Sequence, residues 1–266
     1  MSVGLIIIGD EILSGKREDK HLAKVISLLA TRGLGLAWAH YLPDDRATIA
    51  AFLEQSMNSN DIVFCTGGIG GTPDDHTRQA AAIAAEVPLV RHKEAARLIE
   101  ERIHEIAREQ GASAPVDLRA PEHQQRLTMA DLPHGADLIP NPFNRIPGFS
   151  VGQHYFVPGF PVMAWPMIEW VLDTKYKNLF HREVKRERSV IVYDAYEAQL
   201  TPLMEAIERE FKSVKVFSLP SVGDDTTPRH IEIGVKGDPA VLDRAFDALL
   251  AGMRKTPARL GEQLRR

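Results

Sequence analysis

Short apolar runs alternate with amphipathic segments along the first half of the chain. Leu5–Ile8 and Ile62–Cys65 are continuously apolar, as expected of strands that are covered on both faces. Between them, apolar residues recur at helical spacing in residues 18–32 and Arg46–Met57, and Leu34–Leu42 is typical of a further strand. Strand and helix therefore alternate from the start, which predicts an α/β fold with a mostly parallel sheet between two helical layers.

The pattern continues less regularly up to about residue 177. We expect helices over Asp74–Ala85 and Glu94–Gln110, no clear element in residues 111–127, and a structured loop over residues 141–149. Short strands are predicted over Ala136–Ile139 and His154–Val157, followed by a helix through Trp165–Val171.

A basic, polar stretch near Asn178 predicts a domain boundary, so that residues 1–177 form one domain. After it, the pattern indicates strand, helix, two strands and a helix, which fits a small two-layer α+β domain over residues 178–255. The polar residues 256–266 are expected to form a frayed tail.

The residues best suited to bind a ligand directly follow the third predicted strand. Four glycines and two threonines surround Ile69, and two aspartates come directly afterwards: Thr66, Gly67, Gly68, Gly70, Gly71, Thr72, Asp74 and Asp75. Glycines let backbone amides approach a ligand closely, and a helix N-terminus favours anions. Paired carboxylates suit a divalent metal that bridges a phosphate. This stretch therefore predicts a site for a phosphorylated or pyrophosphate ligand.

Two other strand ends carry acidic residues. Gly9-Asp10-Glu11 follows the first strand, and Pro43-Asp44-Asp45 follows the second. Because ligands bind beyond the carboxyl ends of strands in such sheets, we expect these loops to meet the glycine-rich loop in one pocket.

Composition narrows the class of protein. A formal net charge of −4 over 266 residues argues against a general polyanion binder. The single cysteine, Cys65, excludes an internal disulfide framework and argues against thiolate metal sites. The start of the chain lacks the basic flank and apolar length of a signal peptide, and no apolar run reaches spanning length, so a cytoplasmic location is expected.

These motifs resemble the molybdopterin-binding domain shared by the MoaB, Mog and gephyrin group, in its CinA-type version. Thr66–Gly70 with Asp75-His76-Thr77 matches that family's glycine-rich pattern, and Gly9–Gly15, which includes Ser14, resembles its opening loop. Asn141-Pro142 with Pro147-Gly148, and Pro158–Pro161, resemble its later loops. The similarity covers roughly residues 3–172.

The resemblance carries expectations for the whole chain. It implies a MoaB/Mog-like three-layer domain, a KH-type second domain, and an oligomer that is either a dimer or a trimer. Gly234–Gly237 is the one GxxG sequence of the second domain. The deamidase domain of full-length CinA has no counterpart in this sequence. Nucleic-acid binding is not expected, because Gly234–Gly237 falls between a strand and a helix rather than between two helices.

The resemblance also assigns roles to site residues. Asp75 and Asp44 correspond to acidic positions of the Mog-type enzymes, and Glu11, Asp74 and Asp75 resemble the acidic set that CinA-type domains place around a metal and a pyrophosphate. Ser14, Gly15, Asn141, Pro142 and Gly148 join the glycine-rich loop as expected ligand contacts.

Pro73-Asp74 stands where Mog-type enzymes carry basic residues. This departure favours metal-dependent hydrolysis, with Mg²⁺ or Co²⁺, of a nucleotide pyrophosphate such as ADP-ribose, catalysed by Asp75, Asp44 and Glu11. The alternative is a non-catalytic protein that binds molybdopterin and is linked to molybdenum cofactor biosynthesis.

Structural roles stay open for several of these residues. Asp74 and Asp75 would also suit a helix cap, Glu11 a cap of its own turn, and Asn141 and Asn144 the stabilisation of a turn.

Overall fold

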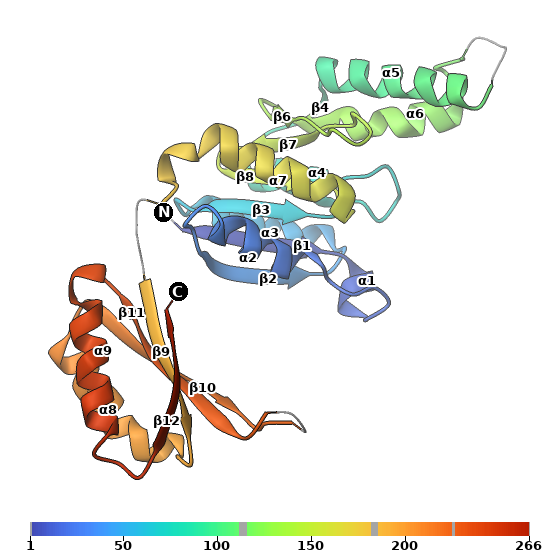
Figure 1. The fold of residues 1–266 in the computed structure, drawn as a ribbon. Coiled ribbons are helices and arrows are strands. Elements are labelled where there is room, and N and C mark those ends of the chain that lie inside the picture. Colours follow the sequence, from blue (N-terminus) through green and yellow to red (C-terminus); the bar gives the residue numbers. More distant parts are fainter. Residues whose placement is uncertain (1, 112–115, 182–185, 225–226, 266) are drawn as a thin grey trace. The chain divides into compact units, whose positions relative to one another are not determined.

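The computed structural model describes residues 2–111, 116–181, 186–224 and 227–265 (Figure 1). Its internal contacts divide the chain into two units, Met1–His181 and Arg182–Arg266.

The first unit is built on a six-stranded mixed sheet in the order β2-β1-β3-β8-β7-β6. The first four strands in this order are parallel, and β7 and β6 continue the sheet in antiparallel pairings. The arrowheads of β1, β2 and β3 point the same way, and α1 lies beyond their tips (Figure 1). The bounds are β1 Val3–Ile8, β2 Leu36–Leu42, β3 Ile62–Thr66, β6 Asp137–Ile139, β7 Gly148–Val151 and β8 His154–Val157.

Helices cover both faces of this sheet, as the alternating pattern predicted. Val3, Leu5 and Ile7 of β1 pack in one core cluster with α2 and α7, while Ile6 and Ile8 pack in another with α3, α4 and α5. The bounds of the helices are α1 Asp10–Leu13, α2 His21–Ala30, α3 Arg46–Met57, α4 Thr77–Ala84, α5 Lys93–Glu109, α6 Pro121–Leu127 and α7 Pro161–Lys175, with short 3-10 helices η1 Thr128–Ala130 and η2 Lys177–Leu179.

Three local predictions were wrong. Residues 111–127 include the helix α6, and residues 148–149, the end of the predicted loop, belong to β7. Helix α4 begins at Thr77, three residues later than predicted, so Asp74 and Asp75 belong to the loop before it. A small separate sheet pairs β4 Leu89–Arg91 with β5 Asp131–Pro133.

The second unit has an antiparallel four-stranded sheet in the order β10-β11-β9-β12. Its two helices pack with the strands in one apolar core. The bounds are β9 Arg186–Tyr193, α8 Glu197–Glu210, β10 Val214–Ser221, β11 His230–Gly237, α9 Pro239–Met253 and β12 Arg259–Arg265.

The prediction of a frayed tail was therefore wrong, because β12 pairs with β9 as the fourth strand; Arg266 lies outside the described residues. With β12 the order becomes β-α-β-β-α-β, the split βαβ arrangement of ferredoxin-like domains, instead of the expected KH-type order. Gly234–Gly237 lies within β11. No described helix of either unit combines the length and apolar character needed to cross a bilayer.

His154 is a buried histidine that joins the sheet to α3. It is 2% exposed, and its Nε2 lies 2.8 Å from the hydroxyl of Ser56. Burial lowers the pKa of His154 from 6.5 to about 4, against a smaller opposing effect of Asp61. The folded protein therefore holds this imidazole neutral at pH values at which the unfolded chain already protonates it.

We predict that the first unit loses about 2 kcal/mol of stability between pH 7.5 and pH 5 because of His154. The stability that the neutral His154 side chain contributes is complete above pH 6.5 and is lost as the pH falls toward 4. Urea unfolding followed by tryptophan fluorescence measures this unit, since Trp38, Trp165 and Trp170 all lie in it. His154→Gln should lose less stability over the same range; an identical decline in both proteins would contradict the assignment.

Candidate functional site

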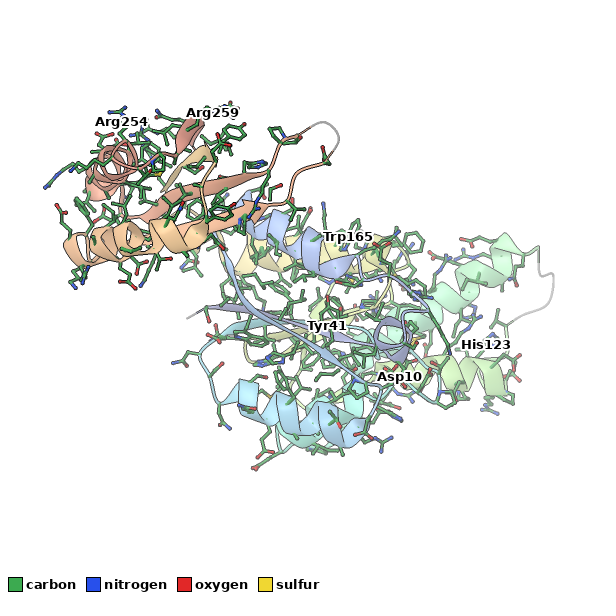
Figure 2. The ribbon with its side chains drawn as sticks, turned by 90° about the horizontal axis from the view of Figure 1, so that it is seen from below. Asp10, Tyr41, His123, Trp165, Arg254 and Arg259 are labelled. Atoms are coloured by element: carbon green, nitrogen blue, oxygen red, sulfur yellow. The ribbon has the colours of Figure 1, made fainter. Side chains whose placement is uncertain are left out.

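The parallel strands bring several loops to one edge of the sheet. The amide of Gly9, after β1, donates to the carbonyl of Leu42 at the end of β2 over 3.1 Å. The amide of Gly67, after β3, donates to the carbonyl of Val157 at the end of β8, also over 3.1 Å. The four strand ends are therefore joined by backbone contacts. Asp10, labelled in Figure 2, begins α1 directly past the end of β1.

These loops enclose a cleft of about 400 Å³. The sequence-predicted residues that line it are Glu11, Asp44, Gly67, Gly68, Gly70, Gly71, Thr72, Asp74, Asp75 and Asn141. The two acidic loops after β1 and β2 therefore meet the glycine-rich loop in one cleft, as expected.

Five predicted ligand contacts do not line the cleft. Thr66 is 1% exposed, and its hydroxyl lies 3.5 Å from the carbonyl of Ile6, inside the sheet. Ser14 and Gly15 end α1 and turn the chain, Gly15 with φ of 71°. Pro142 is an exposed loop residue, and Gly148 belongs to β7.

Gly148 has a packing role instead. A Cβ atom there would lie 2.4 Å from the carbonyl oxygen of Phe156, so a side chain would separate β7 from β8. The need for glycine at this position is explained by strand packing.

The glycine-rich loop lines the cleft and contains several backbone amides without an acceptor. Its carbonyls are held by the protein: Gly67 accepts from the Thr77 hydroxyl, Gly68 from the Thr77 amide, and Gly70 from the Arg78 guanidinium. In contrast, the amides of residues 68–71 have no acceptor among the described residues. A run of unpaired backbone N–H groups is an anion-binding arrangement.

Asp75 closes this loop on itself. Its Oδ2 accepts hydrogen bonds from the amide of Thr72 over 2.8 Å and from the hydroxyl of Thr72 over 2.5 Å. A Cβ atom on Gly70 would lie 2.5 Å from the same oxygen. Asp75 does not cap α4, whose N-cap is His76, so the capping alternative does not describe it.

The pKa of the Asp44 carboxyl group lies above its ordinary value. Burial raises its pKa, and the negative charges of Asp10, Glu11 and Asp74 raise it further. The amide of Asp10 opposes this by donating to Asp44 Oδ2 over 2.8 Å. The charge effects indicate that acidic groups of three different loops are close enough to repel one another.

Arg17 and Phe160 are cleft residues that the sequence reasoning missed. Arg17 is the one basic side chain among the lining residues that the structure describes. It lies 3.4 Å from Glu11 and 5.6 Å from the centre of the Phe160 ring, which is itself 54% exposed. The Pro158–Pro161 motif pointed to this loop, but no sequence signal distinguished Phe160 from a core residue.

The cleft has an apolar side as well as an acidic one. Its apolar lining residues are Ile8, Ile69, Met129, Ile146, Phe160 and Met163. A ligand that fits both sides would carry a charged group and a ring, as nucleotides and pterins do.

Asn141 and Asn144 line the cleft from the loop between β6 and β7, but their side chains are used locally. The Asn141 amide group donates to Asn144 Oδ1 and to the carbonyl of Ile146, over 2.8 and 3.0 Å. Asn144 Oδ1 also accepts from the Ile146 amide. These hydrogen bonds stabilise a turn, which is the structural role that was left open for Asn141 and Asn144 beside ligand contact.

Arg78 is another residue that sequence analysis did not single out. It is 3% exposed and donates to the carbonyls of Gly70, Thr128 and Asp131. It therefore fixes the glycine-rich loop to the segment that follows α6. Its position inside a helix pattern gave no reason to expect a buried cation.

Among the residues that the structure describes, no three histidine, cysteine or acidic side chains form a group that could hold a metal ion by themselves. Magnesium sites that also bind phosphates commonly use only one or two carboxylates. A cation in this cleft would therefore need part of its coordination from a bound phosphate.

Residues 4–178 match a family model described as "Probable molybdopterin binding domain". The chain therefore belongs to this molybdopterin-binding domain family. The curated relatives that it matches include CinA-like proteins, as the resemblance implied. The CinA-like protein of Geobacter metallireducens is 30% identical over 214 residues, which is 79% of this chain and 49% of that protein. That of Anaeromyxobacter sp. strain Fw109-5 is 29% identical over 286 residues, 99% of this chain and 66% of that protein.

The chain thus spans about half to two thirds of the length of these curated relatives. Protein PAE0875 of Pyrobaculum aerophilum is 28% identical over 92% of each chain. The crystal structure of the protein CinA from Thermoplasma acidophilum, titled as of unknown function, has a TM-score of 0.54 at 24% identity, covering 65% of this chain and 98% of that one. That likeness concerns the fold.

Gly67 gives a direct test of how the strand ends are joined. Its φ is 100°, and a Cβ atom would lie 2.2 Å from the carbonyl oxygen of Ile8. We predict that Gly67→Ala lowers the stability of the first unit by more than ~3 kcal/mol, through backbone strain and the clash together.

Gly15→Ala is the matched control, since Gly15 also has a positive φ, of 71°, but a Cβ there meets nothing within 4 Å. It should cost only about 1 kcal/mol. Urea unfolding by tryptophan fluorescence measures both. Equal losses would show that the contact between Gly67 and β1 is not a tight one.

Proposed function

We propose that the first unit binds a nucleotide pyrophosphate such as ADP-ribose in the cleft and hydrolyses it with the help of a divalent cation. The observation that carries this proposal is the run of unpaired amides in residues 68–71, in a cleft that acidic side chains from two other strand-end loops also line. Amides stabilise the diphosphate oxygens, while carboxylates alone would repel them.

The ligand position follows from the charges. The diphosphate lies along residues 68–71, and the attached ring lies against the apolar side, near Ile69 and Met129. Arg17 supplies one positive side chain at the edge of the cleft. Thr72 cannot contribute its amide, since that group already donates to Asp75.

A divalent cation, magnesium or cobalt, held by Asp74, Asp75 and Glu11 together with the phosphates, would neutralise the diphosphate and act as a Lewis acid. Asp44 is suited to accept the proton of the attacking water, because a carboxylate with a raised pKa is a stronger base. Water then adds to one phosphorus, the P–O–P bridge breaks, and ADP-ribose yields AMP and ribose 5-phosphate.

A second candidate function is binding of molybdopterin without turnover. Family membership favours it, since the matching model is described by that ligand. The cleft's apolar side would accept a pterin ring and its amide run a terminal phosphate. In that case the protein would be linked to molybdenum cofactor biosynthesis.

We predict that purified protein releases AMP from ADP-ribose in the presence of Mg²⁺ or Co²⁺, and that Asp75→Asn reduces the rate by at least about 100-fold. The substitution keeps the size of the side chain but removes the charge that orders Thr72 and faces the cation. Chromatographic measurement of AMP against time reports the rate.

The matched control is Asp45→Asn, on the neighbouring loop. Asp45 does not line the cleft; it caps α3 through Thr48, a role that asparagine fills about as well. It should keep the wild-type rate. Absence of AMP release in the wild type, together with saturable quenching of a fluorescent pterin, would favour the binding function instead.

A further inference from the structure

Arg78 is a buried cation that contacts the glycine-rich loop. It is the second residue of α4 and is 3% exposed. Its Nη2 donates to the carbonyl of Gly70 over 2.7 Å, and its Nη1 donates to the carbonyls of Thr128 and Asp131. These carbonyl groups occupy N–H groups of the guanidinium without cancelling its positive charge.

No carboxylate among the described residues pairs with this guanidinium group. The Asp131 carboxylate pairs with Arg91 over 2.5 Å, and the Asp75 carboxylate accepts from the amide and the hydroxyl of Thr72. Burial lowers the pKa of Arg78, and the negative charges of Asp131 and Asp75 act against this effect from a distance. Because a buried charge without an ion-pair partner costs stability, an anion in the neighbouring cleft would balance the charge that Arg78 keeps.

The peptide group between Gly70 and Gly71 links Arg78 to the cleft. Its carbonyl oxygen accepts from Arg78, and its N–H belongs to Gly71, which lines the cleft and whose amide has no acceptor among the described residues. Because C=O and N–H point in opposite directions in a planar trans peptide, the Gly71 N–H points away from the guanidinium group. A charged donor on the carbonyl polarises the peptide group and makes its N–H a stronger donor.

Thr77 shows that neutral groups hold other parts of the same loop. Its hydroxyl donates to the carbonyl of Gly67 over 3.0 Å, and its amide donates to the carbonyl of Gly68 over 2.9 Å. A neutral donor at position 78 would hold the Gly70 carbonyl in the same way and would avoid the cost of burying a charge. The positive charge at position 78 is therefore more than the fixing of the loop requires.

We propose that Arg78 is a positioning residue whose buried positive charge strengthens the binding of anions by the glycine-rich loop. The charge acts through the Gly70–Gly71 peptide group and directly on the bound diphosphate. The inference rests on the proposed function for the presence of a diphosphate in the cleft. It adds that the attraction comes mainly from the buried Arg78, whose charge salt screens weakly, and less from the exposed Arg17.

Isothermal titration with ADP-ribose, without added metal, compares two substitutions of Arg78. Arg78→Gln keeps a donor for a carbonyl group but removes the charge, whereas Arg78→Lys keeps the charge and loses the forked geometry. We expect Arg78→Gln to raise the Kd about 10- to 100-fold, the range for hydrogen bonds to charged groups, and Arg78→Lys to raise it less than about threefold. A solely structural role predicts similar losses for both. At a pH of about 6.5 a buried lysine is protonated even when its pKa is lowered by about 3 units.

Thr77→Val and Arg17→Gln are the matched controls. Thr77→Val removes a neutral contact with the same loop at nearly unchanged side-chain size, and it should raise the Kd less than about fivefold. Arg17→Gln removes an exposed cation of the cleft. Its effect should disappear in about 1 M NaCl, where exposed charges are screened within about 3 Å, whereas the effect of Arg78→Gln should persist.

A measurement on the wild type covers the case in which Arg78→Gln prevents folding. Raising NaCl from about 0.1 M to about 1 M should raise the wild-type Kd for ADP-ribose less than about fivefold, because a buried charge is screened weakly. A larger rise would show that exposed charges supply the attraction, and it would overturn the role of Arg78.

The failures of the two proposals are distinct. Equal Kd values for Arg78→Lys and Arg78→Gln, or a loss in Thr77→Val as large as that in Arg78→Gln, would overturn the charge role and leave the diphosphate cleft standing. Absence of ADP-ribose binding by the wild type would overturn the proposed function, and this inference with it.

Discussion

The close approach of the backbone at Gly67 is the constraint on which the site depends. Gly67 directly follows β3. A Cβ atom there would lie 2.2 Å from the carbonyl oxygen of Ile8, the last residue of β1, and its amide donates to the carbonyl of Val157 at the end of β8. A Cβ on Gly159, the second residue after β8, would lie 3.4 Å from the Gly67 Cα. Any side chain at Gly67 would push these strand ends apart. The cleft is therefore a consequence of how four parallel strands end together.

That arrangement concentrates charge that the protein does not neutralise by itself. Burial raises the pKa of Asp44, and the negative charges of Asp10, Glu11 and Asp74 raise it further. Of the nearby cations, Arg78 is buried against three carbonyls, and the exposed Arg17 makes one ion pair of 3.4 Å with Glu11. This cluster beside unpaired amides supports the proposal that a cation and an anion bind in the cleft together.

Much of the first unit could be predicted from its sequence, because buried parallel strands and a glycine-rich turn leave strong local patterns. The strand-end acids could also be predicted, since the fold class alone brings them to one edge. Arg17, Phe160 and Arg78 could not, because their surroundings depend on which loops meet in space. The sequence predicts Gly148 as a ligand contact, because the close packing of β7 and β8, which leaves no room for a Cβ atom there, is visible only in the structure.

The elements that were missed have weak periodicity. In α6, Leu127 is the one buried residue, so no apolar stripe marks the helix. In β12 the pairing with β9 shifts between Leu260 and Gln263, and this irregularity breaks the two-residue alternation by which a half-buried strand is recognised. Without β12, the sequence pattern predicts a KH-type order for the second unit.

Amide hydrogen exchange of the glycine-rich loop tests the central claim most directly. In the free protein the amides of residues 68–71 have no acceptor among the described residues, so a peptide covering residues 67–72 should exchange rapidly. Saturating ADP-ribose should slow this peptide more than any other in the first unit. If ADP-ribose binds saturably and this peptide exchanges at an unchanged rate, the diphosphate lies elsewhere and the account is wrong.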